Sequence, residues 1–124
     1  AVKMTRTQFE EDGLLEEDLP ACEAYELWLR VSWRYPVHLI ETPLIIKRGG
    51  HADQLSKAPG LDKFRIQALK KVIESGQLEQ ASYRAAVRTL QEKCTIVAGG
   101  CRKRGKDAEA LYYEELAIRM GQSA

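Results

Sequence analysis

Residues 45–56 read Ile45-Ile46-Lys47-Arg48-Gly49-Gly50-His51-Ala52-Asp53-Gln54-Leu55-Ser56, an apolar, β-branched run that stops at two adjacent glycines. The apolar run predicts a strand, and the glycine pair predicts a sharp turn or a close approach of the backbone to a ligand. His51 stands at the mouth of that turn, between Arg48 and Asp53. A histidine and charged groups of both signs at the end of a strand can form an anion site or a metal site.

The composition is that of one globular domain. The chain has 124 residues, of which 44% are hydrophobic and 30% are charged, and its formal net charge is +1. This length is sufficient for a real core, and the near-zero charge gives no reason to expect a nucleic-acid partner. The one basic run, Arg102-Lys103-Arg104-Gly105-Lys106, lacks interleaved aromatic residues and is typical of the solvated end of a helix.

The sequence also bears on the compartment. No apolar run is long enough to span a bilayer, and the N-terminus lacks the pattern of a secretory signal, so we expect a cytoplasmic protein or one peripheral to the inner membrane. The three cysteines cannot all pair within one chain, and Cys94 and Cys101 are seven residues apart, which is too far for a disulfide on one helix. Buried free thiols are therefore expected for Cys22, Cys94 and Cys101.

Apolar periodicity predicts an α+β chain that is mostly helical. Residues 37–40 and 44–47, interrupted by Thr42-Pro43, are expected to form two short strands or one bent edge strand. A short strand pair is the predicted arrangement. The C-terminal part is expected to be a three-helix unit whose helices end before glycines. The predicted helices, including a short one near the N-terminus, cover residues 5–12, 21–34, 61–75, 79–104 and 108–120.

Three segments in this order resemble the C-terminal half of family 2 glycosyltransferases. They are Phe9-Glu10-Glu11-Asp12-Gly13-Leu14, Leu19-Pro20-Ala21-Cys22-Glu23-Ala24-Tyr25-Glu26-Leu27-Trp28-Leu29-Arg30 and Pro43-Leu44-Ile45-Ile46-Lys47-Arg48-Gly49-Gly50-His51. In that family a Glu-Asp pair begins a helix that continues Tyr-Asp-Leu-Trp-Leu-Arg, and a later strand ends in a basic residue and a His-containing turn. The resemblance covers residues 1–56, and residues 57–124 look like a helical C-terminal extension.

The resemblance implies a fold, an activity and partners. The fold would be the C-terminal fragment of a nucleotide-sugar-transferase α/β domain of the GT-A type. The activity would be inverting transfer of a sugar from a nucleoside-diphosphate sugar to a hydroxyl of a glycan acceptor, in cell-envelope or secondary polysaccharide synthesis. The family's cofactor is a divalent cation, Mn²⁺ or Mg²⁺, which neutralises charge on the departing diphosphate.

The same resemblance assigns candidate site residues. Glu23 and Glu26 are the candidate catalytic carboxylates near the acceptor, and His51 is the candidate cation ligand. Arg48, Gly49 and Gly50 are the candidate contacts to the nucleotide sugar. Ala24 stands where the family has its catalytic Asp and cannot accept a proton. The family's nucleotide-binding half lies upstream of the matched residues, so this chain alone is expected to be inactive and to bind the cation and the nucleotide sugar weakly.

Other interpretations of these residues stay open. Glu23 is also a favourable first-turn acid for any helix, and Trp28 and Trp33 share a helical face that favours core packing over sugar stacking. An alternative function is a helical interaction or dimerisation module without catalysis. We expect a homo-oligomer in either case, joined through the strand region or through the face from Tyr83 to Cys101.

Overall fold

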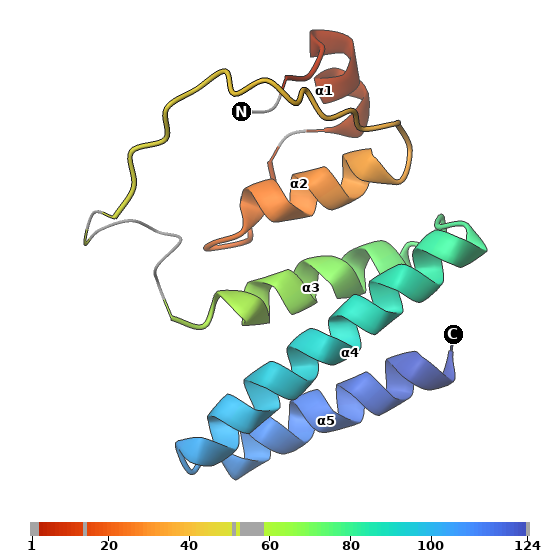
Figure 1. The fold of residues 1–124 in the computed structure, drawn as a ribbon. Helices are drawn as coiled ribbons and strands as arrows, with labels where there is room; N and C mark the ends of the chain where they lie inside the picture. The colour runs from red at the N-terminus through yellow and green to blue at the C-terminus, as the bar shows by residue number, and fades with distance from the viewer. Residues whose placement is uncertain (1–2, 14, 51, 53–58, 124) are drawn as a thin grey trace.

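The computed structural model describes residues 3–13, 15–50, 52 and 59–123, and within them it contains helices but no strand. The expected strand pair at 37–40 and 44–47 is therefore wrong, and so are the α+β class and the assignment to an α/β domain. Figure 1 shows the helices α1 (Arg6–Asp12), α2 (Glu23–Ser32), α3 (Leu61–Glu74), α4 (Gln80–Lys103) and α5 (Asp107–Gln122).

The expected C-terminal three-helix unit is present. α4 lies between α3 and α5, and α2 packs on α3, while α1 contacts α2 (Figure 1). α3 and α4 end where the glycines predicted, because Gly76 (φ 69°) and Gly105 (φ 70°) adopt the left-handed conformation that favours glycine. After α4 the Lys106 N–H donates to the Cys101 carbonyl at 2.9 Å, which closes the turn into α5.

Two helix starts test the capping signals. Thr5 caps α1, since its hydroxyl accepts from the Gln8 N–H at 3.2 Å and the Gln8 side chain accepts from the Thr5 N–H at the same distance. Asp107 is the first residue of α5, and no side chain caps the start of that helix. That helix also continues through Gly121, where the sequence predicted its end.

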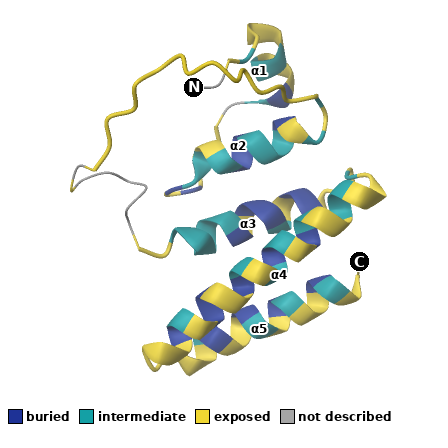
Figure 2. Cartoon of the chain, in the orientation of Figure 1, coloured by how far each residue is buried: buried dark blue, intermediate teal, exposed yellow. Residues whose placement is uncertain are grey.

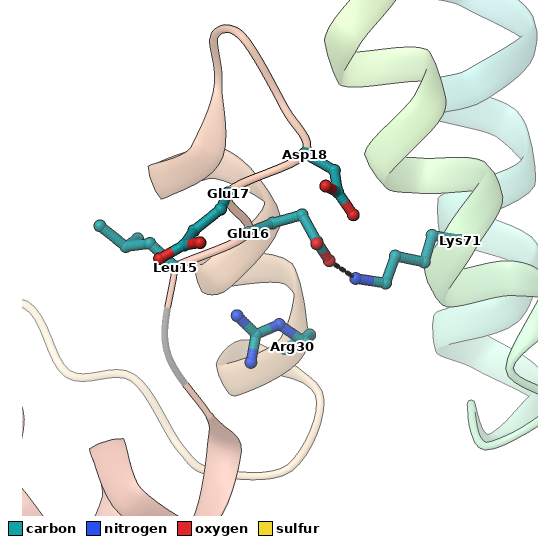
Figure 3. Close-up of a pocket in the computed structure, with 6 residues that line it drawn as sticks. All are labelled: Leu15, Glu16, Glu17, Asp18, Arg30 and Lys71. Atoms are coloured by element: carbon teal, nitrogen blue, oxygen red, sulfur yellow. Dashed lines mark hydrogen bonds and ion pairs between the residues drawn. The ribbon is translucent and has the colours of Figure 1, made fainter.

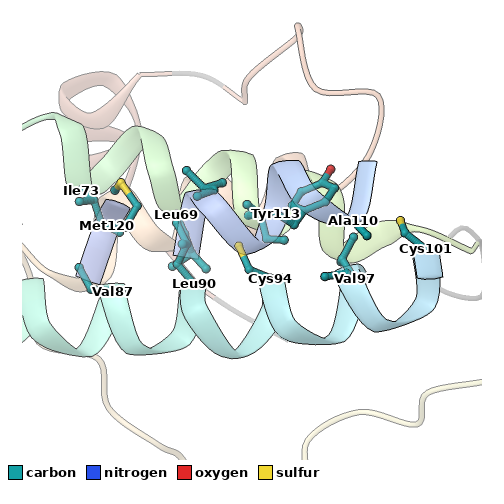
Figure 4. Packing of buried hydrophobic residues seen from close by; sticks show 13 residues of the cluster. Leu69, Ile73, Val87, Leu90, Cys94, Val97, Cys101, Ala110, Tyr113 and Met120 are labelled. Carbon is teal, nitrogen blue, oxygen red and sulfur yellow. The ribbon is translucent and has the colours of Figure 1, made fainter. Parts of the chain in front are cut away.

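One face of α4 forms the centre of the core. Leu90, Cys94 and Cys101 are fully buried there, between α3 and α5 (Figures 2 and 4). All three cysteines are free thiols, as expected, but only Cys94 and Cys101 are buried, and Cys22 is half-buried. Burial raises the pKa of Cys94 to about 11. The face from Tyr83 to Cys101 is thus occupied by the chain's own helices, so it offers no open surface to a second copy. The buried cluster consists of Ile66, Leu69, Ile73, Val87, Leu90, Cys94, Val97, Ala98, Cys101, Ala110, Tyr113, Leu116 and Met120.

After α2, residues 36–50 form a long trace without helix or strand (Figure 1). A β-branched run forms a strand only when another backbone satisfies its N–H and C=O groups, and no described segment pairs with this one. Fully burying an aliphatic side chain stabilises a fold by roughly 1.5–3 kcal/mol, and this stretch leaves that stabilisation unrealised. The side chains concerned are Val37, Leu39, Ile40, Leu44, Ile45 and Ile46, which are 58–90% exposed.

The packing of α4 generates a stability prediction. Replacing Leu90, which is fully buried, by Ala should lower the free energy of unfolding by about 2–5 kcal/mol because it leaves a cavity between three helices. Ile96→Ala on the same helix is the matched control, since Ile96 is 64% exposed and its truncation should change stability by less than about 0.5 kcal/mol. Urea unfolding followed by circular dichroism measures both, and equal losses in the two variants would contradict the described core.

Candidate functional site

The candidate site is built on the start of α2, where the backbone is strained. Cys22 precedes the helix with φ 61° and is the one non-glycine residue with positive φ in the described ranges. Such a conformation costs roughly 1–3 kcal/mol and is common at functional sites. The Cys22 thiol lies 3.6 Å from the Leu61 carbonyl, and this contact ties the start of α2 to the start of α3.

The first two residues of α2 differ in their exposure to solvent. Glu23 is half-buried, and Ala24, for which the resemblance implies a catalytic Asp, is exposed. A carboxylate in a first turn is favoured by the helix dipole, which stabilises its charged form. The structure therefore leaves position 24 accessible to a molecule approaching from solvent.

Glu26, the second candidate carboxylate, is only 2% exposed. Its Oε1 accepts a hydrogen bond from Arg30 Nε at 2.8 Å and lies 3.3 Å from Lys71 Nζ of α3. These cations offset part of the cost of burying its charge. The position of Glu26 between α2 and α3 favours a structural role over contact with an acceptor.

An open hollow lies beside this ion pair, between the 15–18 segment, α2 and α3 (Figure 3). Lys71 points from α3 toward Glu16 and donates a hydrogen bond to it. That hydrogen bond raises the pKa of Lys71 and lowers the pKa of Glu16. The hollow carries both signs of charge, and its lining is Leu15, Glu16, Glu17, Asp18, Arg30 and Lys71.

A second buried carboxylate ties α1 to α2. The side chain of Asp12 is fully buried, and its Oδ1 accepts from Arg34 Nη1 at 2.6 Å. Arg30 also donates to the Asp12 main-chain carbonyl. One oxygen of each buried carboxylate, Asp12 Oδ2 and Glu26 Oε2, has no hydrogen-bond partner within the described ranges. Buried acceptors of this kind are commonly satisfied by ordered water.

The structure does not bring the remaining candidates to α2. Arg48, Gly49 and Gly50 are exposed on the segment that follows α2, and Gly50 has φ 96°, in keeping with the expected turn. His51 lies outside the described residues. The candidate set is thus divided between the first turn of α2, the α2–α3 interface and an exposed segment.

The sequence did not predict the buried ion pairs of this region, which involve Asp12, Lys71 and Arg30. Asp12 precedes Gly13 at a helix C-terminus, where the dipole disfavours an acid, and that placement signals a nearby cation. Lys71 interrupts the apolar register of α3 directly before Val72. Arg30 follows Glu26 by four residues, a spacing that predicts a pair but does not predict that the pair is buried.

Comparison of the chain with protein-family models, with curated proteins and with solved structures gives no match. In the described part of the chain, no helix is long and apolar enough to cross a membrane. No three histidines, cysteines or carboxylates come together there as ligands for a metal ion.

The Glu16–Lys71 contact generates a pH prediction. Glu16 has its pKa lowered below the ordinary value of 4.5, so the contact stabilises the folded chain above that pH and is lost as the pH falls through the lowered pKa. Lys71→Gln should therefore be less stable than the parent chain at pH 7, and the difference should shrink toward pH 3. Urea unfolding followed by the fluorescence of Trp28 and Trp33 reports this end of the molecule.

The neighbouring lysine provides the control for that experiment. Lys70 forms only a loose contact with Glu74, 3.7 Å apart within the same helix. Lys70→Gln should give a stability profile parallel to that of the parent between pH 7 and pH 3. A gap between Lys71→Gln and the parent that stays constant over this range would show that the contact is not formed in solution.

Proposed function

We propose that this chain is the C-terminal part of an inverting family 2 glycosyltransferase that acts in cell-envelope or secondary polysaccharide synthesis. The proposal rests on the ordered resemblance of residues 9–51 to that family and on the geometry of α2. The single observation that carries it is the exposure of position 24 in the first turn of α2, two residues after the strained Cys22. A carboxylate at that position would be open to an acceptor and favoured by the helix dipole.

In inverting sugar transfer, a carboxylate at position 24 would act as the general base. In inverting transfer an acceptor hydroxyl attacks the anomeric carbon, the bond from that carbon to the nucleoside diphosphate breaks, and a base removes the hydroxyl proton. Ala24 cannot take that proton. Glu23 is half-buried beside it and is the carboxylate best placed to hydrogen-bond the acceptor. Glu26 is committed to Arg30 and Lys71, and its contribution is to hold α2 on α3.

A divalent cation, which the family uses, does not fit the described residues. They contain no cluster of three ligands, and His51, the candidate ligand, lies outside them. No step of the proposal therefore passes through the cation. The exposed Arg48 is proposed to contact the diphosphate of the nucleotide sugar, with Gly49 and Gly50 next to it in the chain, because a guanidinium binds phosphate oxygens.

Position 24 gives the test of the proposed function. Ala24→Asp in the complete gene product should raise sugar transfer by about 10²–10⁴-fold, the usual contribution of a general base. Transfer is measured with a panel of nucleoside-diphosphate sugars, Mn²⁺ or Mg²⁺ and glycan acceptors. The substitution should be tolerated, since Ala24 is exposed and an acid suits a first turn.

Ala81→Asp is the matched control, because Ala81 is also exposed and is also the second residue of its helix, α4. It adds the same charge in the same local geometry and should leave transfer unchanged. Equal activity of Ala24→Asp, Ala24→Asn and the parent chain would overturn the proposal that this position is the family's base position.

One observation favours the alternative, an interaction module without catalysis. The most exposed apolar side chains in the described ranges are gathered on one segment, between α2 and α3. Exposed apolar stretches of this kind mark association surfaces. Absence of transfer by Ala24→Asp together with tight association through that segment would favour the module.

A further inference from the structure

The apolar segment, defined as residues 37–48, pairs with no other described segment, and its apolar side chains alternate in the sequence so that an extended backbone would place them on both faces. Six of the eleven large hydrophobic residues that are exposed in the described ranges lie on it, and Leu39 and Ile46 are 86% and 90% exposed. Its main chain forms no strand ladder with any described part of the chain. An unpaired apolar stretch of this kind pairs readily with another chain.

We propose that the apolar segment pairs antiparallel with the same segment of a second copy, with Leu44 facing Leu44 on the two-fold axis. In this register residues whose numbers sum to 88 face each other. Glu41 of each copy therefore lies opposite Lys47 of the other. The inference concerns only residues 37–48 and does not rest on the proposed function.

Charge complementarity selects this pairing. Glu41 and Lys47 stand at equal distances from Leu44, one on each side, so a two-fold axis at Leu44 forms two opposite-charge pairs at once. A parallel, in-register pair would place Glu41 beside Glu41 and Lys47 beside Lys47, and like charges directly opposite are destabilising. A shift of two residues in the antiparallel pair leaves both charges opposite uncharged residues.

Pro43 decides which facing residues of this register form hydrogen-bonded pairs and which form non-hydrogen-bonded pairs. Proline has no N–H, so it is compatible only with a ladder position whose N–H points away from the partner. If the facing Leu44 residues exchange the ladder hydrogen bonds, the neighbouring odd-numbered residues point their N–H groups outward. Pro43 then loses no bond, and Glu41 and Lys47 occupy the closer, non-hydrogen-bonded type of pair.

The apolar side chains agree with the pairing. Side chains alternate between the two faces of a strand, so Thr42, Leu44 and Ile46 share one face. In the proposed register they form a continuous row across the dimer, with Thr42 opposite Ile46. This row covers part of the surface that each copy exposes alone.

A charge exchange tests the register. The intact 124-residue chain should sediment as a dimer at micromolar concentration. Glu41→Lys and Lys47→Glu should each weaken the dimer by roughly tenfold, because each turns two attractive pairs into repulsive ones. The double variant Glu41→Lys/Lys47→Glu should restore the parent dissociation constant to within about threefold, since the pairs are re-formed with exchanged signs.

Glu92→Lys supplies the control, because Glu92 is exposed on α4 and lies outside the apolar segment. It makes the same charge change and should leave the dimer unaffected. A chain that stays monomeric at micromolar concentration would overturn the inference. Failure of the double variant to recover association would also overturn it, because the register requires Glu41 and Lys47 to face each other.

A cross-linking pair checks the axis independently. Leu44→Cys should form an intermolecular disulfide under mild oxidation, because facing Cα atoms in a hydrogen-bonded pair are about 5.5 Å apart. Thr42→Cys should not, because the two copies of residue 42 would be separated by about 13 Å along the strands. Cross-linking of both variants to the same extent would contradict the two-fold axis at Leu44.

Discussion

The structure depends on the packing of the apolar face of α4 between α3 and α5. Leu90, Cys94 and Cys101 lie at the centre of that face and are inaccessible to solvent. No single helix of this length could bury such a face alone, so the three helices stabilise one another. Through α3 the same core also fixes α2, since Tyr25 and Leu29 of α2 pack against the buried cluster.

Buried ion pairs hold the N-terminal part together with buried apolar side chains such as Leu27 and Val31. Glu26 lies under Arg30 and Lys71, and Asp12 lies under Arg34. Removing one partner of a buried pair leaves an uncompensated charge, so these contacts fix where α1 and α2 sit more strictly than exposed ion pairs would. The first turn of α2 is thereby oriented with position 24 toward solvent, and that orientation is what makes a catalytic interpretation testable.

The helices could be predicted because their signals are local. In α3 and α4 the apolar spacing and the glycines that follow are signals contained within a few neighbouring residues. The structure confirms the predicted bounds of both helices closely. The strand pair failed because a strand depends on a partner backbone, which the β-branched run itself does not encode. The burial of Glu26 was not predictable from its spacing to Arg30, because it depends on Lys71, far along the chain. The candidate site failed to assemble for the same reason: Glu23 and Arg48 belong to segments that share no described contact.

The central claim is that a packed helical unit carries an apolar segment with which no other described part of the chain pairs. Amide hydrogen exchange of the 124-residue chain, measured residue by residue at a concentration where it is monomeric, tests this most directly. The account predicts the strongest protection for the amides of α4 around Leu90 and Cys94, and exchange at nearly the unfolded rate throughout residues 37–48. Strand-like protection of residues 37–48 in the monomer, comparable with that of α4, would contradict the account, because it would mean that the chain satisfies this backbone itself.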